Sequence, residues 1–103
     1  MNNTNKHDDN KSRVSLLDCS LRDGSYLVDF KFTAYDTFVV SAALASCNIP
    51  YIEIGHGTGL GSSQRTSSLA AEPDIAYLQA GAAGVAGSSS KFGVFFIPLI
   101  GLE

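Results

Sequence analysis

The sequence lacks the features that mark several large classes of protein. No apolar run approaches the roughly 20 residues needed to cross a bilayer, which excludes a membrane span. The seven lysines and arginines do not cluster and are outnumbered by ten acidic residues, giving a net charge of -3. We therefore expect neither nucleic acid nor a membrane as a partner. The polar first residues lack the apolar stretch of a secretory signal, which favours a cytoplasmic location.

Cysteine is also scarce. Cys19 and Cys47 are the two cysteines of the chain, and neither belongs to a CxxC pair. Two cysteines do not make a disulfide scaffold, so we expect reduced, half-buried thiols.

What the sequence does contain is enough apolar material for one folded domain. The chain has 103 residues, of which 45% are hydrophobic and 17% charged. This composition is typical of a globular domain and not of a disordered chain. Residues 1–13 are polar and of mixed charge, which predicts a disordered arm. We assign the folded domain to residues 14–103.

The first half of that domain predicts a strand followed by a helix. Residues 14–18 form an apolar run that predicts the first strand. Thr33 and Asp36 have the spacing of a capping box at the start of a helix. The helix is predicted to end near residues 47–48, ahead of Pro50. Its apolar stripe has helical spacing and consists of Tyr35, Phe38, Val39, Ala42, Ala45 and Ile49.

The second half repeats the pattern. Residues 51–55 predict a second strand, and residues 56–72 a glycine- and serine-rich loop whose length favours a functional role. A helix is expected from Pro73, although its glycines each cost about 1 kcal/mol relative to alanine and predict fraying at its C-terminal half. Residues 92–98 are apolar throughout and predict a third strand. The order β-α-β-α-β predicts an α/β fold with parallel strands.

The residues suited to chemistry follow these strands. Arg22 and Asp23 come after the first strand, and Glu53 and His56 lie at the end of the second. The carboxyl ends of parallel strands meet at the edge of the sheet where ligands bind. Asp23 is a hard oxygen ligand suited to Mg²⁺ or Mn²⁺, and the planar cation of Arg22 can hold a carboxylate or an enolate. The pattern indicates chemistry on a 2-oxo acid, unless Arg22 and Asp23 only pair with each other or with neighbouring strands.

Three segments together resemble one known family. The segment LDCSLRDG at residues 17–24 resembles the opening motif of the metal-dependent pyruvate aldolase/acyltransferase superfamily, also called hydroxymethylglutaryl-CoA lyase-like or DRE-TIM. Residues 52–63 and residues 91–101 are similar to the second- and third-strand segments of its 4-hydroxy-2-oxovalerate aldolase branch. The resemblance runs from about Val14 to Gly101, in the same order and spacing.

The resemblance implies a fold and a set of roles. The fold would be part of a TIM barrel, about three of its eight parallel strands, with the site at the C-terminal face. Asp23 would be one ligand of a divalent Mn²⁺ or Mg²⁺ ion. Arg22 would stabilise the enolate of pyruvate, and Glu53 would orient the groups near the metal. The substrate would be a small 2-oxo acid, cleaved by a carbon–carbon lyase or aldolase.

Two departures from the family pattern bear on these roles. Tyr26 stands where the family has a histidine base, and a phenol with a pKa of about 10 is a poorer base at pH 7 than an imidazole near 6.5. Tyr26 is therefore a candidate catalytic residue in place of that histidine. The family's His-x-His metal ligands have no counterpart, since the histidines are His7 and His56. We therefore expect a partial enzyme, inactive by itself, that self-associates or needs a partner chain to complete its barrel.

A different interpretation starts from the glycines at residues 55–63. Alternating glycines after a strand resemble a phosphate-cradling loop, which would make the chain a non-catalytic nucleotide-binding or regulatory module. His56 either hydrogen-bonds within this loop or contacts a ligand directly. By the simplest interpretation, Tyr35, Phe38 and Phe95 are core aromatics.

Overall fold

The computed structural model describes residues 13–62 and 69–96 of the chain. The predicted arm lies outside this range except for Arg13, as does the predicted end of the third strand after residue 96. Within the described range, no helix is long and apolar enough to cross a membrane.

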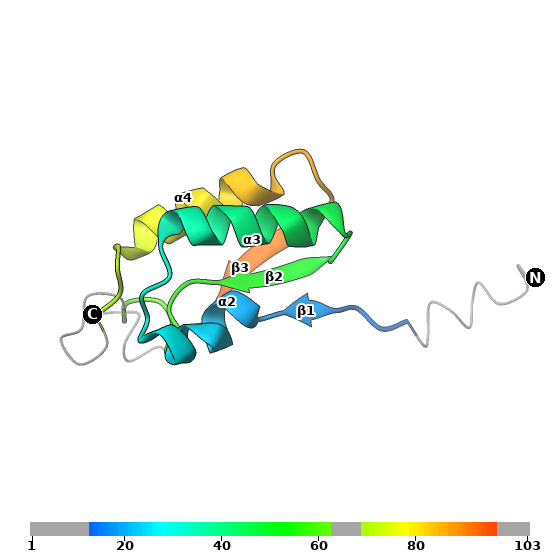
Figure 1. The fold of residues 1–103 in the computed structure, drawn as a ribbon. Helices are drawn as coiled ribbons and strands as arrows, with labels where there is room; N and C mark the ends of the chain where they lie inside the picture. Colours follow the sequence, from blue (N-terminus) through cyan, green and yellow to red (C-terminus); the bar gives the residue numbers. More distant parts are fainter. Residues whose placement is uncertain (1–12, 63–68, 97–103) are drawn as a thin grey trace, which may run out of the picture.

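Three parallel strands form one sheet in the order β1-β2-β3. They are β1 (Leu17–Asp18), β2 (Tyr51–Ile54) and β3 (Lys91–Val94). Helix α3 (Ala34–Ser46) connects the first two strands and α4 (Asp74–Val85) connects the second pair. Both helices cover the same face of the sheet (Figure 1). The predicted α/β fold is confirmed, and it is consistent with part of a TIM-barrel-like domain.

The chain after β1 is helical. It forms a one-turn helix, α2 (Ser20–Asp23), and then a 3-10 helix, η2 (Gly24–Val28). The carboxylate of Asp18 starts α2, because it accepts hydrogen bonds from the backbone N–H and the hydroxyl of Ser20 at 2.9 and 3.0 Å. β1 itself is shorter than predicted and begins at Leu17.

The start of α3 is as predicted. Thr33 is its N-cap, and the backbone N–H of Asp36 donates to the Thr33 hydroxyl at 3.0 Å. In return, the Asp36 carboxylate accepts from the backbone N–H of Thr33 at 2.9 Å. This capping box satisfies two backbone donors that the first helical turn leaves unpaired.

The core lies between the sheet and the two helices. Its fully buried apolar residues come from α2, α3 and β2, and they are Leu21, Ala45, Ile52 and Ile54. Side chains of β2 alternate between the two faces of the sheet. Ile52 and Ile54 therefore face the helices, and Glu53 faces the opposite side.

The helix-to-helix seam corrects the predicted core face of α3. Tyr35, Phe38 and Val39 are exposed, whereas Thr37 and Ser41 are buried. Ser41 lies against Gly84 of α4, and a Cβ added there would overlap the Ser41 hydroxyl. Small residues let the two helices approach closely, so the buried stripe is small rather than large and apolar. The glycines do not end α4 early, because the helix extends to Val85.

A buried tyrosine joins α4 to the chain before α3. Tyr77 is buried, and its hydroxyl donates to the Phe32 carbonyl at 2.6 Å and accepts from the backbone N–H of Glu72 at 3.2 Å. Burial raises the pKa of Tyr77 above its usual value, against the opposing effect of the backbone hydrogen bonds. Tyr77 therefore stabilises the fold in its neutral form.

Replacing Gly84 by alanine should destabilise the protein by about 1–3 kcal/mol, because the added methyl group forces α3 and α4 apart. Helix propensity by itself predicts a gain of about 1 kcal/mol. The free energy of unfolding in urea distinguishes the expected loss from the expected gain. Gly93→Ala is the control, since a Cβ at Gly93 meets no atom within 4 Å. A Gly84→Ala protein more stable than wild type would contradict the packing argument.

Tyr77→Phe should lower the free energy of unfolding by about 1–2 kcal/mol at pH 8, because the buried hydrogen bonds are lost. An unfolded tyrosine has a pKa of about 10, and the folded value is higher. The contribution of Tyr77 is therefore complete below pH 10 and is lost as the pH rises through the folded value. Urea unfolding at pH 8 and pH 11 should show the difference between wild type and variant narrowing. Tyr35→Phe, at an exposed position, should change neither value.

Candidate functional site

Groups from all three strand ends meet at one edge of the sheet. α2 follows β1, a glycine loop (residues 55–62) follows β2, and Phe95 directly follows β3. The strands are parallel and adjacent, so their carboxyl ends lie side by side (Figure 1). The predicted convergence of Arg22 with Glu53 is observed here.

Arg22 lies at the centre of this edge. Its Nε donates to Oε1 of Glu53 at 2.7 Å, and its Nη1 donates to the carbonyl oxygen of Gly57 at 3.1 Å. Both charged side chains are largely withdrawn from water, with 19% of Arg22 and 15% of Glu53 exposed. Glu53 reaches Arg22 from the sheet face that α3 and α4 leave uncovered.

The charge on Arg22 is secure. Its hydrogen bond with Glu53 raises the pKa of the guanidinium above its already high ordinary value, and this outweighs the opposing effect of burial. Arg22 is therefore a fixed cation at every pH at which the chain is folded. Glu53 holds this cation through the hydrogen bond at Nε, and its role beside a metal stays a prediction.

Asp23 lies next to Arg22 but faces water. Its side chain is 57% exposed, and its Oδ1 lies 3.4 Å from Nη2 of Arg22. Its Oδ2 accepts a hydrogen bond from the thiol of Cys19 at 3.0 Å. This bond, followed by slight desolvation and by the nearby negative charges of Asp23 and Glu53, raises the pKa of Cys19, while Arg22 acts in the opposite direction.

The described residues do not fit a complete site for a divalent metal. No group of three or more histidine, cysteine, aspartate or glutamate side chains comes together in residues 13–62 and 69–96. Asp23 offers one carboxylate, and Glu53 is engaged by Arg22. A Mg²⁺ or Mn²⁺ ion needs about six oxygen ligands. Asp23 as a metal ligand stays a prediction.

Tyr26 belongs to an aromatic cluster rather than to the Arg22 contacts. It lies on η2, and its ring meets that of Phe30 edge-on at 5.2 Å between centroids. Phe30 in turn stacks on His56 at 4.2 Å. Just over half of Tyr26 is exposed. Its role as a base stays a prediction.

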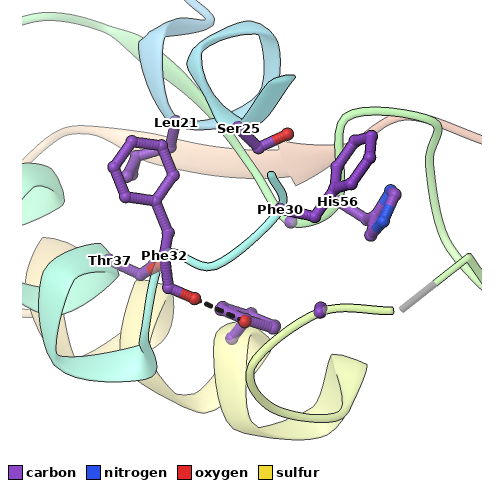
Figure 2. A pocket seen from close by; sticks show the side chains of 9 residues that line it. Leu21, Ser25, Phe30, Phe32, Thr37 and His56 are labelled. Atoms are coloured by element: carbon purple, nitrogen blue, oxygen red, sulfur yellow. Dashed lines mark hydrogen bonds between the residues drawn. The ribbon is translucent and has the colours of Figure 1, made fainter. Parts of the chain in front are cut away.

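His56 is a structural part of the loop. Its side chain is buried, and Nδ1 accepts a hydrogen bond from the backbone N–H of Thr58 at 3.0 Å. Figure 2 shows His56 and Phe30 together on one side of a small pocket, with Leu21 and Phe32 on the other. The loop-bonding interpretation of His56 is therefore favoured over a ligand role.

The glycine loop does not have the geometry of a phosphate cradle. All five backbone amides from Thr58 to Ser62 already donate within the protein, to His56, Gly59, Phe95 and Asp74. At Gly61 the acceptor is the Asp74 carboxylate, at 2.8 Å, so a protein anion lies where a phosphate would compete. A phosphate-binding loop needs amides that are free to point at the ligand. The loop instead uses its amides to hold its own shape.

Phe95 is the site residue that the sequence did not reveal. We expected it in the core, but it is 37% exposed, and its ring lies under Arg22 with Cζ 4.6 Å from the ring centroid. The available signal was its position directly after the third strand, at the edge where Arg22 was expected. In a uniformly apolar segment, such a residue looks like core.

The chain is similar to several curated proteins. It is 35% identical over 88 residues to a 4-hydroxy-2-oxovalerate aldolase of Brevibacillus brevis, covering 85% of this chain and 25% of that protein. It is 36% identical over 89 residues to the protein of the same name from Carboxydothermus hydrogenoformans, covering 86% of this chain and 26% of that protein. An oxaloacetate decarboxylase of Mycobacterium tuberculosis is 35% identical over 85 residues, or 82% of this chain and 24% of that protein.

The chain spans about a quarter of the length of the curated relatives that it matches. No protein-family model matches it. The matched region includes most of the residues on which the resemblance rested. The chain is therefore a homologue, over about 85% of its length, of proteins named 4-hydroxy-2-oxovalerate aldolase, and this similarity supports the resemblance to the first part of the hydroxymethylglutaryl-CoA lyase-like superfamily.

Proposed function

We propose that this chain carries the arginine-bearing part of the active site of an aldolase or lyase that acts on a 2-oxo acid. The observation that carries the proposal is the Arg22–Glu53 pair, a fixed cation held at the carboxyl edge of a parallel sheet. The names of the relatives support the same class of reaction. The substrate proposed is a small 4-hydroxy-2-oxo acid.

The work assigned to Arg22 follows from the reaction. When the bond between C3 and C4 breaks, the C4 hydroxyl gives up its proton and leaves as an aldehyde, and the electron pair moves onto the 2-oxo group. The resulting enolate carries its charge on the C2 oxygen, and protonation at C3 then gives pyruvate. A preorganised cation beside that oxygen stabilises the transition state, by about 3–4 kcal/mol for one well-placed donor.

Glu53 and Tyr26 have supporting roles in this proposal. Glu53 keeps the guanidinium in one orientation, so Arg22 does not have to reorganise as charge develops. Tyr26 occupies the position of the family's proton-accepting histidine and is the proposed partner of the C4 hydroxyl. Its exposed ring leaves the phenol accessible from solvent.

A divalent Mg²⁺ or Mn²⁺ ion, with Asp23 as one ligand, is part of the proposal. Such an ion acts as a Lewis acid toward the oxygens of a 2-oxo acid. The described residues do not complete its site, and the full sequence holds no His-x-His pair, so the proposal takes the missing ligands from a partner chain. We therefore expect the chain to be inactive by itself.

A chimeric enzyme tests the role of Arg22. The chain replaces the matched 88 residues of the Brevibacillus brevis aldolase, and pyruvate release from a 4-hydroxy-2-oxo acid is followed with lactate dehydrogenase. Arg22→Ala in the chimera should lower kcat about 10²–10³-fold, as the loss of one preorganised donor does.

Arg13→Ala is the matched control, since it removes an exposed arginine outside the site, and it should leave kcat unchanged. A folded chimera that releases no pyruvate, or an Arg22→Ala chimera as fast as its parent, would contradict the proposal.

The thiol of Cys19 reports on whether Asp23 is held as described. The thiolate is the form that reacts, and Asp23 raises the pKa of Cys19. In a Cys47→Ser background, Asp23→Ala should therefore lower that pKa and speed alkylation by iodoacetamide at pH 8. The pH profile of the alkylation rate should move to lower pH.

Asp29→Asn is the control, because it removes one negative charge elsewhere on the surface. It should leave the rate and its pH profile unchanged. Equal rates for Asp23→Ala and its parent would show that Asp23 does not contact the thiol.

A further inference from the structure

Phe95 connects the third strand to the arginine of the site. It directly follows β3, and its ring lies under the guanidinium of Arg22, with Cζ 4.6 Å from the ring centroid. A cation within about 6 Å of an aromatic face is attracted by the electron-rich ring. Arg22 and Phe95 belong to segments that are more than 70 residues apart in the sequence, so this contact exists only in the folded sheet.

The glycine loop also contacts Phe95. The backbone carbonyl of Phe95 accepts a hydrogen bond from the N–H of Leu60 at 2.8 Å. A Cβ added to Gly59 would lie 2.9 Å from that carbonyl oxygen and 3.2 Å from the Phe95 ring. Gly59 also has a φ of +102°, a conformation that side chains rarely adopt. The loop can lie directly on Phe95 because this residue is a glycine.

These contacts together restrain both the rotation of the Arg22 guanidinium within its plane and the tilt of that plane. Glu53 and the Gly57 carbonyl hold it through hydrogen bonds at Nε and Nη1, which fix its rotation within the guanidinium plane. Such bonds alone leave the plane free to tilt. Cζ of Arg22 lies over the Phe95 ring, 4.6 Å from its centroid, so the ring blocks movement of the guanidinium toward it and limits the tilt.

We propose that Phe95 is a positioning residue for Arg22, holding the guanidinium plane so that its remaining N–H groups point in a fixed direction. The value of that direction rests on the proposed function, in which Arg22 meets the developing enolate. Phe95 needs no contact with the substrate to act in this way.

The test observes Arg22 directly by NMR on the 103-residue chain. The Nε–H signal of Arg22, assigned by its loss in Arg22→Lys, should exchange slowly with water and show a nuclear Overhauser contact to the Phe95 ring. Phe95→Leu should speed the exchange about two- to fivefold, the factor that corresponds to an exposed cation–aromatic contact. Phe95→Tyr keeps an aromatic face and should restore the wild-type rate.

Phe96→Leu is the matched control, since it makes the same change at the next residue, which is also exposed. It should leave the exchange unchanged. Unchanged exchange in Phe95→Leu, or an equal effect in Phe96→Leu or Phe95→Tyr, would overturn the proposal. If Phe95→Leu does not fold, the wild-type spectrum decides. The absence of a nuclear Overhauser contact between the Arg22 Nε–H and the Phe95 ring would also overturn the proposal.

The NMR experiment and the test of the proposed function can fail independently of each other. A chimera that releases no pyruvate would remove the reaction assigned to Arg22 and leave the NMR result intact. A chimera that releases pyruvate, together with an Arg22 signal indifferent to Phe95, would keep the function and remove the positioning role.

Discussion

The ion pair between Arg22 and Glu53 is the interaction on which the rest of this site depends. Glu53 projects from the middle strand onto the sheet face that the helices do not cover, where a lone carboxylate with little exposure would be costly. Arg22 compensates that charge, and in doing so it ties α2 to the sheet. Removing either partner leaves the other charge largely withdrawn from water, which is more damaging than the loss of one surface pair.

The covered face of the sheet follows a different principle. α3 and α4 approach each other through small side chains, with Ser41 against Gly84, and the larger apolar residues pack between the helices and the strands. Ser41 satisfies its own hydroxyl by donating to the Thr37 carbonyl at 2.6 Å. A polar side chain can therefore be fully buried without a partner from another element. Rigid packing on this face supports the strand ends that carry the site.

The fold could be predicted to a large extent because its signals are local. Thr33 and Asp36 form a capping box within four residues, and the alternation around Glu53 marks a strand without reference to the rest of the chain. The buried face of α3 could not be predicted, because Ser41 is buried by a glycine more than 40 residues away. Intrinsic hydrophobicity favoured Tyr35 and Phe38 for that face, and tertiary packing overrode it.

The same distinction holds at the site. Arg22 and Glu53 could be brought together from sequence, since parallel topology places their strand ends side by side. Phe95 could not, because an aromatic residue at the end of an apolar strand has the pattern of core until the loop above it is placed. The short helix α2 also begins with hydrogen bonds from Ser20 to the Asp18 carboxylate, which no periodicity reveals.

The glycine loop has one more consequence, for how the sequence can vary. It lies as a layer between the α2–η2 segment, which it meets at Gly57, and the end of β3, which it meets at Gly59. Its thickness there is that of bare backbone. A single methyl group at either glycine would widen the spacing between the first and third strand ends. Arg22 would then be displaced, although none of the residues that contact it had been replaced. The narrow space between these two segments therefore limits which residues the loop can carry. Even alanine, the smallest replacement for glycine, is poorly tolerated at these two positions.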